Sequence, residues 1–187
     1  MSTAGEVVSL VLLLDRLSAL PRTGWLLRGV TDPESIAEHT FGVCLVATRL
    51  VDDLRARGEI IDGERVLRMA LLHDAAEVFT GDIPMPAKMP ALDAALEAAE
   101  TELLAKALPP ADLALWQEAE AGTTLEARIV KAADKVQMLI KALGYEQQRR
   151  GRLDEFWQNG KNRRHMDLAF AQELFAELDR LVALERP

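Results

Sequence analysis

The sequence predicts an all-α fold, and three observations lead to it. Strong helix formers fill nearly every long segment. No alternating run of β-branched residues competes as a strand. Proline and glycine interrupt the helical pattern at intervals that leave segments of ordinary helix length. Because 187 residues are close to the size of one domain, we expect a single domain over residues 1–187.

Breakers and caps give each expected element its bounds. Asp32 is the expected N-cap of the second helix, with Pro33 at the first helical position and Glu34 in the first turn. Thr123 to Glu126 match a capping box, and residues 80–90 hold three prolines, which predicts a loop. A polar connector over 151–162 carries Phe156 and Trp157 as expected packing anchors. The expected helices cover about residues 5–20, 32–57, 63–78, 92–108, 110–121, 125–150 and 166–184.

Charge and composition exclude several classes of partner. Lys and Arg total 22 against 30 Asp and Glu, so the net charge is −8, which disfavours a grip on nucleic acid. The lone Cys44 excludes an internal disulfide framework and is expected to act as a small buried hydrophobe. The strongest apolar stretch, residues 7–14, is shorter than the about 20 residues that span a bilayer. It also lacks a basic leader, so we expect a soluble, cytoplasmic protein with no membrane partner.

Four side chains stand out as candidate metal ligands. His39 and His73 lie inside apolar helical segments, and Asp74 follows His73 directly. A buried ionisable doublet costs free energy unless it is paired or binds a metal. Asp134 lies between apolar residues on another expected helix. Each alone has a plainer interpretation, as a hydrogen-bonded core histidine or an exposed acid. Together the set suits a divalent ion such as Mn, Fe, Co, Ni or Zn.

Two further acids flank the doublet. Glu77 follows His73 by four residues, so the two share a helix face. A glutamate near a helix C-terminus opposes the helix dipole and calls for a nearby cation. Asp82, in the loop, is alternatively a turn-forming residue. A bound metal lowers the pKa of water from about 15.7 towards neutrality, and Glu77 would serve as base or positioner. Arg22 and Lys88 are candidate phosphate partners, or alternatively solvated charges.

The pattern His39, His73-Asp74 and Asp134 resembles the HD-domain metal-dependent phosphohydrolase superfamily. The resemblance covers about residues 10–156 and implies a single-domain HD-domain helical bundle, followed by the C-terminal helix at about 166–184. The 5′-deoxynucleotidase branch is similar over several segments. These segments are residues 21–25, 33–39, 72–84, 127–134 and 144–153.

The resemblance implies a role for each matching residue. Glu77 would orient or deprotonate the attacking water, and Asp82 would share the catalytic role. Gly24 stands before Trp25 where the best-known bacterial members carry arginine, and Met85 replaces a threonine. Alternatively, Trp25 serves only to pack in the hydrophobic core. The implied metal ligands are His39, His73, Asp74 and Asp134, with Glu77, Asp82 and the backbone of Ile83 at a second ion or the substrate. The implied substrate contacts are Arg22, Trp25, Asp82, Ile83, Pro84 and Met85.

The implied activity is hydrolysis of deoxynucleoside 5′-monophosphates to deoxynucleoside and phosphate. The implied cofactor is a divalent cation, Mn, Co or Mg, with Fe, Ni or Zn as alternatives. One alternative keeps the metal but changes the substrate to a triphosphate, a cyclic dinucleotide or an alarmone. Another is a non-catalytic helical regulatory module. Apolar faces left over on the Ala-rich helices, together with the family's habit, predict a homodimer.

Overall fold

The computed structural model describes residues 3–84, 90–163 and 167–185, and its regular elements within these ranges are all helical. The all-α expectation is confirmed. Short 3₁₀ helices η1 (Asp15–Ala19) and η3 (Gly160–Arg163) accompany the α-helices in the described part of the chain. The α-helices are α1 (Ala4–Leu14), α2 (Thr23–Leu26), α3 (Ile36–Ala56), α4 (Gly63–Leu72), α5 (Glu77–Thr80), α6 (Pro90–Ala107), α7 (Pro110–Ala121), α8 (Leu125–Gln147), α9 (Asp154–Gln158) and α10 (Ala169–Glu185).

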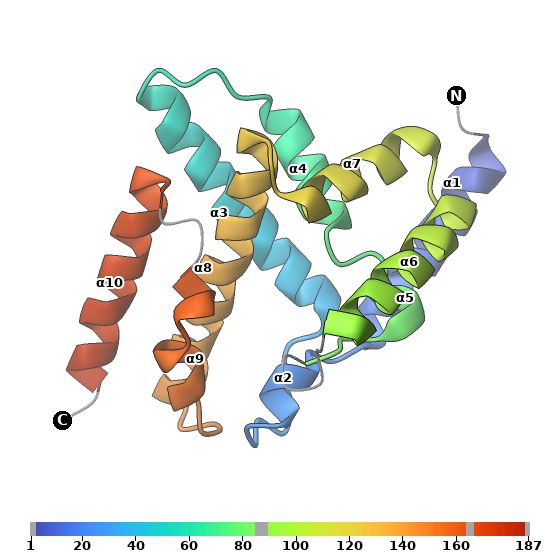
Figure 1. Cartoon of the computed structure of the whole chain (residues 1–187). Helices are drawn as coiled ribbons and strands as arrows, with labels where there is room; N and C mark the ends of the chain where they lie inside the picture. The colour runs from blue at the N-terminus through green and yellow to red at the C-terminus, as the bar shows by residue number, and fades with distance from the viewer. Residues whose placement is uncertain (1–2, 85–89, 164–166, 186–187) are drawn as a thin grey trace.

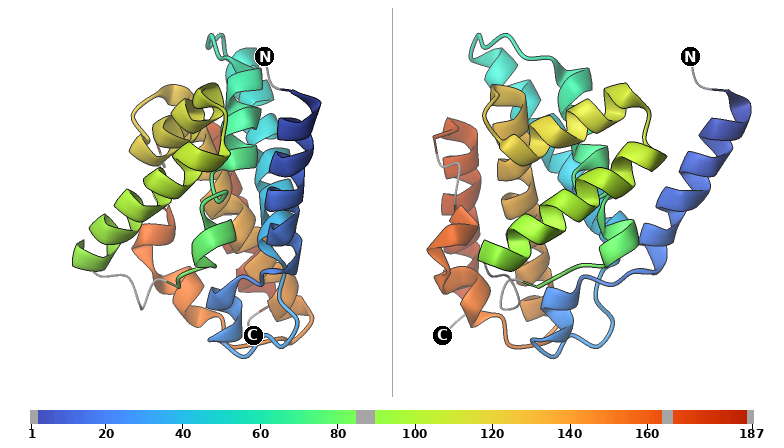
Figure 2. Two further views of the ribbon diagram at one scale, coloured as in Figure 1. Left: turned by 90° about the vertical axis from the view of Figure 1, so that its right-hand side faces the viewer. Right: turned by 45° about the vertical axis from the view of Figure 1, so that its right-hand side comes forward.

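The two longest helices, α3 and α8, pack against each other at the centre of the molecule (Figure 1). Val43 and Leu50 of α3 and Val136 and Leu139 of α8 are fully buried. Helices α4 and α7 cover one part of this pair, and α10 packs along α8 on the other side. Helix α1 runs along one edge of the molecule and buries none of its residues (Figure 2). Across the described ranges, each helix is too short or too polar to cross a membrane.

The start of α3 differs from the expectation. Its N-cap is Ser35, not Asp32, and Ser35 and Glu38 form a capping box. The pairing that fixes this start involves the preceding segment: the N–H of Arg22 donates to the carbonyl of Glu34 at 3.0 Å, and that of Ile36 donates to Leu20 at 2.9 Å. Glu34 is thereby directed into the core, where it is 4% exposed, and α2 is held against the beginning of α3.

The helix expected over 63–78 is interrupted. Helix α4 ends at Leu72, residues 73–76 form a turn, and α5 follows. Within the turn the N–H groups of Ala75 and Glu77 donate to carbonyls three residues back, at 2.9 and 3.1 Å. This tighter spacing replaces the four-residue spacing of an α-helix. The spacing of apolar residues continues through the turn, so the sequence pattern did not indicate that the helix is interrupted there.

The remaining breakers act close to where they were expected. Pro110 begins α7, and Gly122 ends it in the left-handed region at φ 63°. Thr124, rather than Thr123, caps α8 by accepting the N–H of Ala127. The first expected helix is α-helical only to Leu14 and tightens into η1. The expected connector over 151–162 contains α9 and η3.

Candidate active site

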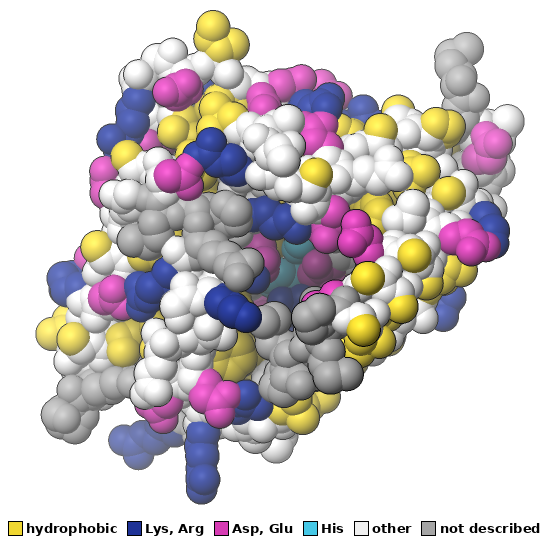
Figure 3. All heavy atoms as spheres, in the orientation of Figure 1, with side chains coloured by type: hydrophobic (Ala, Val, Ile, Leu, Met, Phe, Trp, Pro, Cys, Tyr) yellow, Lys and Arg dark blue, Asp and Glu magenta, His cyan; other side chains and the backbone are white. Residues whose placement is uncertain are grey.

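Four predicted ligands meet where α3, α8 and the turn after α4 come together. His39 Nε2 lies 3.4 Å from His73 Nε2, 3.6 Å from Asp74 Oδ2 and 3.3 Å from Asp134 Oδ1. Ligand atoms of His39, His73 and Asp74 all lie within 4.8 Å of one another. Histidine is visible at the bottom of a hollow on one face, with acidic and basic side chains around it (Figure 3). Two imidazoles and two carboxylates therefore converge at one point.

The turn at residues 73–76 explains how adjacent residues reach the same point. Consecutive side chains on a regular α-helix diverge by about 100°. Because the backbone tightens after Leu72, His73 Nε2 and Asp74 Oδ2 lie only 3.2 Å apart. The break in the expected helix is thus what forms the doublet.

The outer nitrogen of each imidazole is already hydrogen-bonded. His73 Nδ1 lies 2.8 Å from the carbonyl oxygen of Ala70, so it carries the proton and donates. His39 Nδ1 lies 2.5 Å from Gln137 Oε1. Both arrangements leave Nε2 as the ring nitrogen that faces the centre of the cluster and can give its lone pair to a metal. This is how a protein presents neutral imidazole to a metal.

The two carboxyl groups are held ionised. Burial opposes ionisation of Asp74, but His73 and Arg22 outweigh it and lower its pKa. Burial likewise opposes ionisation of Asp134, whose pKa is held well below its usual value by Lys135 and His39. Burial disfavours the charged form of His73, yet Asp74 raises its pKa. Two buried anions beside two imidazoles thus favour positive charge at the centre, and the donor set fits a divalent transition metal.

Arg22 lies across the acidic side of the cluster. Its Nη1 donates to Asp74 Oδ2 at 3.1 Å and lies 4.0 Å from Glu77 Oε1 and 3.9 Å from Asp82 Oδ1. Coulombic attraction from the acids, led by Asp74, overcomes burial and raises the pKa of Arg22, so its charge is permanent. Arg22 therefore places a positive charge between Asp74, Glu77 and Asp82, where it could also meet a phosphate.

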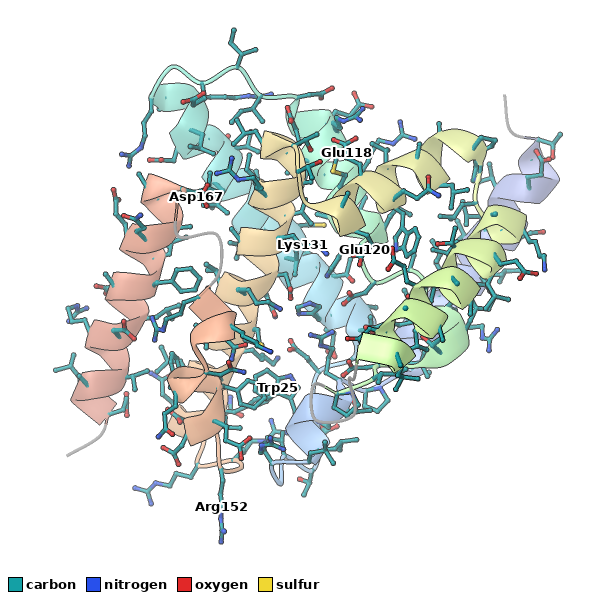
Figure 4. All side chains as sticks on the ribbon, in the orientation of Figure 1. Trp25, Glu118, Glu120, Lys131, Arg152 and Asp167 are labelled. Atoms are coloured by element: carbon teal, nitrogen blue, oxygen red, sulfur yellow. The ribbon has the colours of Figure 1, made fainter. Side chains whose placement is uncertain are left out.

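Trp25 lies in the core rather than on the open face. It belongs to α2, is 2% exposed and points towards α9 (Figure 4), where it stacks on Phe156 with ring centroids 4.3 Å apart. Its indole N–H donates to Glu34 Oε1 at 3.0 Å. This placement favours the packing interpretation of Trp25 over a direct contact with substrate.

The loop after α5 supplies the remaining predicted residues. Asp82 is held by hydrogen bonds to Thr23 at the start of α2. Ile83 and Pro84 follow it and are half-buried. Met85, Lys88 and His165 lie outside the described residues.

Sequence reasoning missed Thr23, Glu34 and Gln137. Gln137 follows Asp134 by three residues on α8, so it shares the helix face of that ligand. A polar side chain on the buried face of an apolar helix was the available signal. Glu34 carried no such signal, because its neighbours in sequence match a helix start.

The model of the HD domain family matches residues 14–174. The 5′-deoxynucleotidase HDDC2 of Xenopus laevis is 36% identical over 166 residues, covering 83% of this chain and 79% of the relative. The human protein of that name is 31% identical and covers 93% and 87%. The crystal structure of the PH0347 protein from Pyrococcus horikoshii OT3 has a TM-score of 0.82 at 36% identity, covering 93% and 99%. This chain belongs to the HD domain family.

Proposed function

We propose that this protein is a metal-dependent 5′-deoxynucleotidase, which hydrolyses deoxynucleoside 5′-monophosphates to deoxynucleoside and phosphate. One observation carries the proposal: His39, His73, Asp74 and Asp134 converge beside Glu77, Asp82 and Arg22. Relatives that cover most of the chain are named 5′-deoxynucleotidases, which supports this substrate class. The HD domain core is proposed to span about residues 10–156.

His39, His73, Asp74 and Asp134 would hold the divalent ion, for which Mn, Co and Mg are proposed first and Fe, Ni and Zn as alternatives. When bound, the ion supplies Lewis acidity towards a phosphoryl oxygen and makes water more acidic. Asp82, the backbone of Ile83 and Glu77 are proposed to contact a second ion or the substrate.

Glu77 is proposed to orient the attacking water and take its proton. The water oxygen forms a bond to phosphorus as the bond from phosphorus to the sugar O5′ breaks, and the leaving oxygen gains a proton. Arg22 neutralises phosphate charge, because its guanidinium lies on the Glu77 side of the cluster. Pro84 and Met85 are proposed to line the nucleotide site, and Trp25 to support it from behind.

Phosphate release from a panel of deoxy- and ribonucleoside 5′-monophosphates tests the proposal. The protein is stripped with chelator and supplied separately with Mn, Co or Mg. Turnover of the deoxy set that needs added metal supports it. Absence of turnover with every metal, despite a bound ion, overturns it and directs the search to triphosphates, cyclic dinucleotides or alarmones.

Glu77→Gln separates catalysis from binding. A catalyst loses turnover while the variant keeps the ion held by His39, His73, Asp74 and Asp134, since these four ligands are untouched. A regulatory module that only retains the site would show no turnover in the wild type. Its ligand affinity would be the same in Glu77→Gln as in the wild type.

We also propose a homodimer formed through α1. Val8, Val11 and Leu12 are 58%, 61% and 66% exposed on a helix that buries none of its residues. Apolar surface of this kind marks contact sites when it is contiguous. Light scattering of the wild type and of Val11→Glu tests it: a dimer that becomes a monomer supports the assignment to α1, and a monomeric wild type contradicts it.

A further inference from the structure

We propose that Gln137 and Glu34 are positioning residues that fix the tautomer of His39, so that its Nε2 lone pair faces the metal centre. The inference deepens the proposed metal site and rests on it. Neither residue touches the cluster of ligand atoms through its own polar groups; they act through His39.

The relay begins at a carboxylate whose neighbours are all donors. Glu34 Oε1 accepts the indole N–H of Trp25 at 3.0 Å, and Oε2 accepts the Nε2–H of Gln137 at 3.0 Å. Lys141 Nζ lies 3.7 Å from Oε2. An indole and an ammonium group can only donate. Glu34 is therefore held as an acceptor on both oxygens.

The carboxylate fixes the orientation of the amide. A glutamine side chain donates from its nitrogen and accepts with its oxygen. Because Nε2 of Gln137 faces Glu34, Oε1 faces His39 and lies 2.5 Å from Nδ1. Gln137 is 7% exposed and His39 is fully buried, so water does not offer a competing partner. Nδ1 must then carry a proton, and Nε2 is the ring nitrogen left to bind a metal.

The helices are built to hold this relay. On α8, Asp134, Gln137 and Lys141 recur at helical spacing and share one face. On α3, Gly42 lies one turn beyond His39, and a Cβ there would meet Gln137 Cγ at 2.7 Å and Nε2 at 2.9 Å. The glycine thus lets the amide lie against α3, beside the imidazole that it orients.

The relay makes an isosteric change informative. In Glu34→Gln, Trp25 can still only donate, so the new amide turns its oxygen to the indole and its nitrogen towards Gln137. Gln137 must then turn over and present its own nitrogen to His39. Nδ1 of His39 must then accept, so the ring keeps its proton on Nε2 and its lone pair faces away from the metal centre. If Glu34 had a purely structural role, Glu34→Gln, which keeps the side-chain shape and removes one charge, should have little effect on metal binding.

Two measurements test the relay. Titration with Zn²⁺ against a competing chelator gives metal affinity, and ¹⁵N NMR of metal-free protein labelled at histidine gives the tautomer. The chain has 3 histidines, which keeps the spectra simple. Gln137→Leu and Glu34→Gln should each weaken Zn²⁺ binding by about 10–100-fold, as loss of an orienting partner does. Glu34→Gln should also remove the proton from His39 Nδ1, while the wild type keeps it.

Met138→Ala is the matched control. Met138 is 8% exposed on the same helix and outside the relay, so its truncation should lower the thermal midpoint without changing affinity or tautomer. Wild-type affinity and tautomer in both relay variants would overturn the inference. If Gln137→Leu fails to fold, Glu34→Gln decides alone. A wild type that binds Zn²⁺ but hydrolyses no nucleotide would refute the proposed function and leave this test intact.

Discussion

The backbone N–H of Thr23 donates to Asp82 Oδ2 at 2.6 Å, and the Thr23 hydroxyl donates to the Asp82 carbonyl oxygen at 2.6 Å. These bonds join the start of α2 to the loop after α5. They leave Oδ1 of Asp82 on the side of Arg22, 3.9 Å from its Nη1. The position of a predicted catalytic acid is thus set by a residue from far away in the sequence.

Thr23→Val should loosen this loop. Loss of the hydroxyl removes a hydrogen bond worth about 1 kcal/mol and leaves the Asp82 carbonyl without that donor. We expect the free energy of unfolding to fall by about that amount in urea denaturation, and kcat/KM to fall with it. Thr23→Ser keeps the hydroxyl and should behave like wild type. Equal free energies of unfolding and equal kcat/KM in Thr23→Val and Thr23→Ser would contradict a role for the hydrogen bond from the Thr23 hydroxyl.

Arg22→Met should weaken substrate binding more than turnover. The variant removes a cation that lies within 4.0 Å of carboxylate oxygens of Asp74, Glu77 and Asp82. A hydrogen bond to a charged group is worth about 1.5–3 kcal/mol, so KM should rise by about tenfold or more. Steady-state kinetics with saturating metal measure it. Arg16→Met, at an exposed arginine on η1, is the control, and an unchanged KM in Arg22→Met would assign Arg22 to structure alone.

Acid should weaken the N-terminus of α3 through its capping box. The Ser35 backbone N–H and hydroxyl donate to Glu38 and lower its pKa below the ordinary 4.5. A group whose pKa is lower in the folded state adds stability above its unfolded pKa, and this is lost as pH falls through the folded value. Urea denaturation from pH 7 to 3 should show that loss reduced in Glu38→Gln and retained in Glu59→Gln. Ser35→Ala should cost about 1 kcal/mol at pH 7.

Two glycine-to-alanine changes should shift the free energy of unfolding in opposite directions. Gly144 lies inside α8 and a Cβ there meets nothing within 4 Å, so Gly144→Ala should stabilise the fold by about 0.5–1 kcal/mol. Gly42→Ala gains the same helix propensity but forces a Cβ into Gln137, and overpacking costs about 1–3 kcal/mol. Chemical denaturation compares them. If both changes stabilised the fold, the Gln137 side chain would have to move away from the new Cβ at no cost in free energy.

The all-α fold and most helix boundaries were predictable because the signals are local. Pro110 and Gly122 act within a residue or two of themselves, and α7 begins and ends where they indicate. The cap of α3 was misplaced because Asp32-Pro33-Glu34 matches a helix start as well as Ser35 does. The contacts that withdraw Glu34 into the core come from Trp25 and Gln137, which the local pattern does not include.

The convergence of His39, His73, Asp74 and Asp134 was anticipated from residue chemistry and the family resemblance. Their roles, and those of Glu77, Asp82 and Arg22, stay predictions. The turn at residues 73–76 was not predictable from periodicity, because its apolar residues continue the pattern of α4. Gln137 carried a signal, as a polar residue on the buried face of α8, but its partner Glu34 is brought to it only by the fold.

The candidate ligands come from three separate stretches of chain, at residue 39, residues 73–74 and residue 134. An ion held by all of them would act as a reversible crosslink that ties α3 and α8 to the end of α4. Binding at a thousandfold excess over Kd adds about 4 kcal/mol to the folded state. The thermal midpoint should therefore climb with metal concentration, and stripping the ion should expose the chain to proteases long before it unfolds completely.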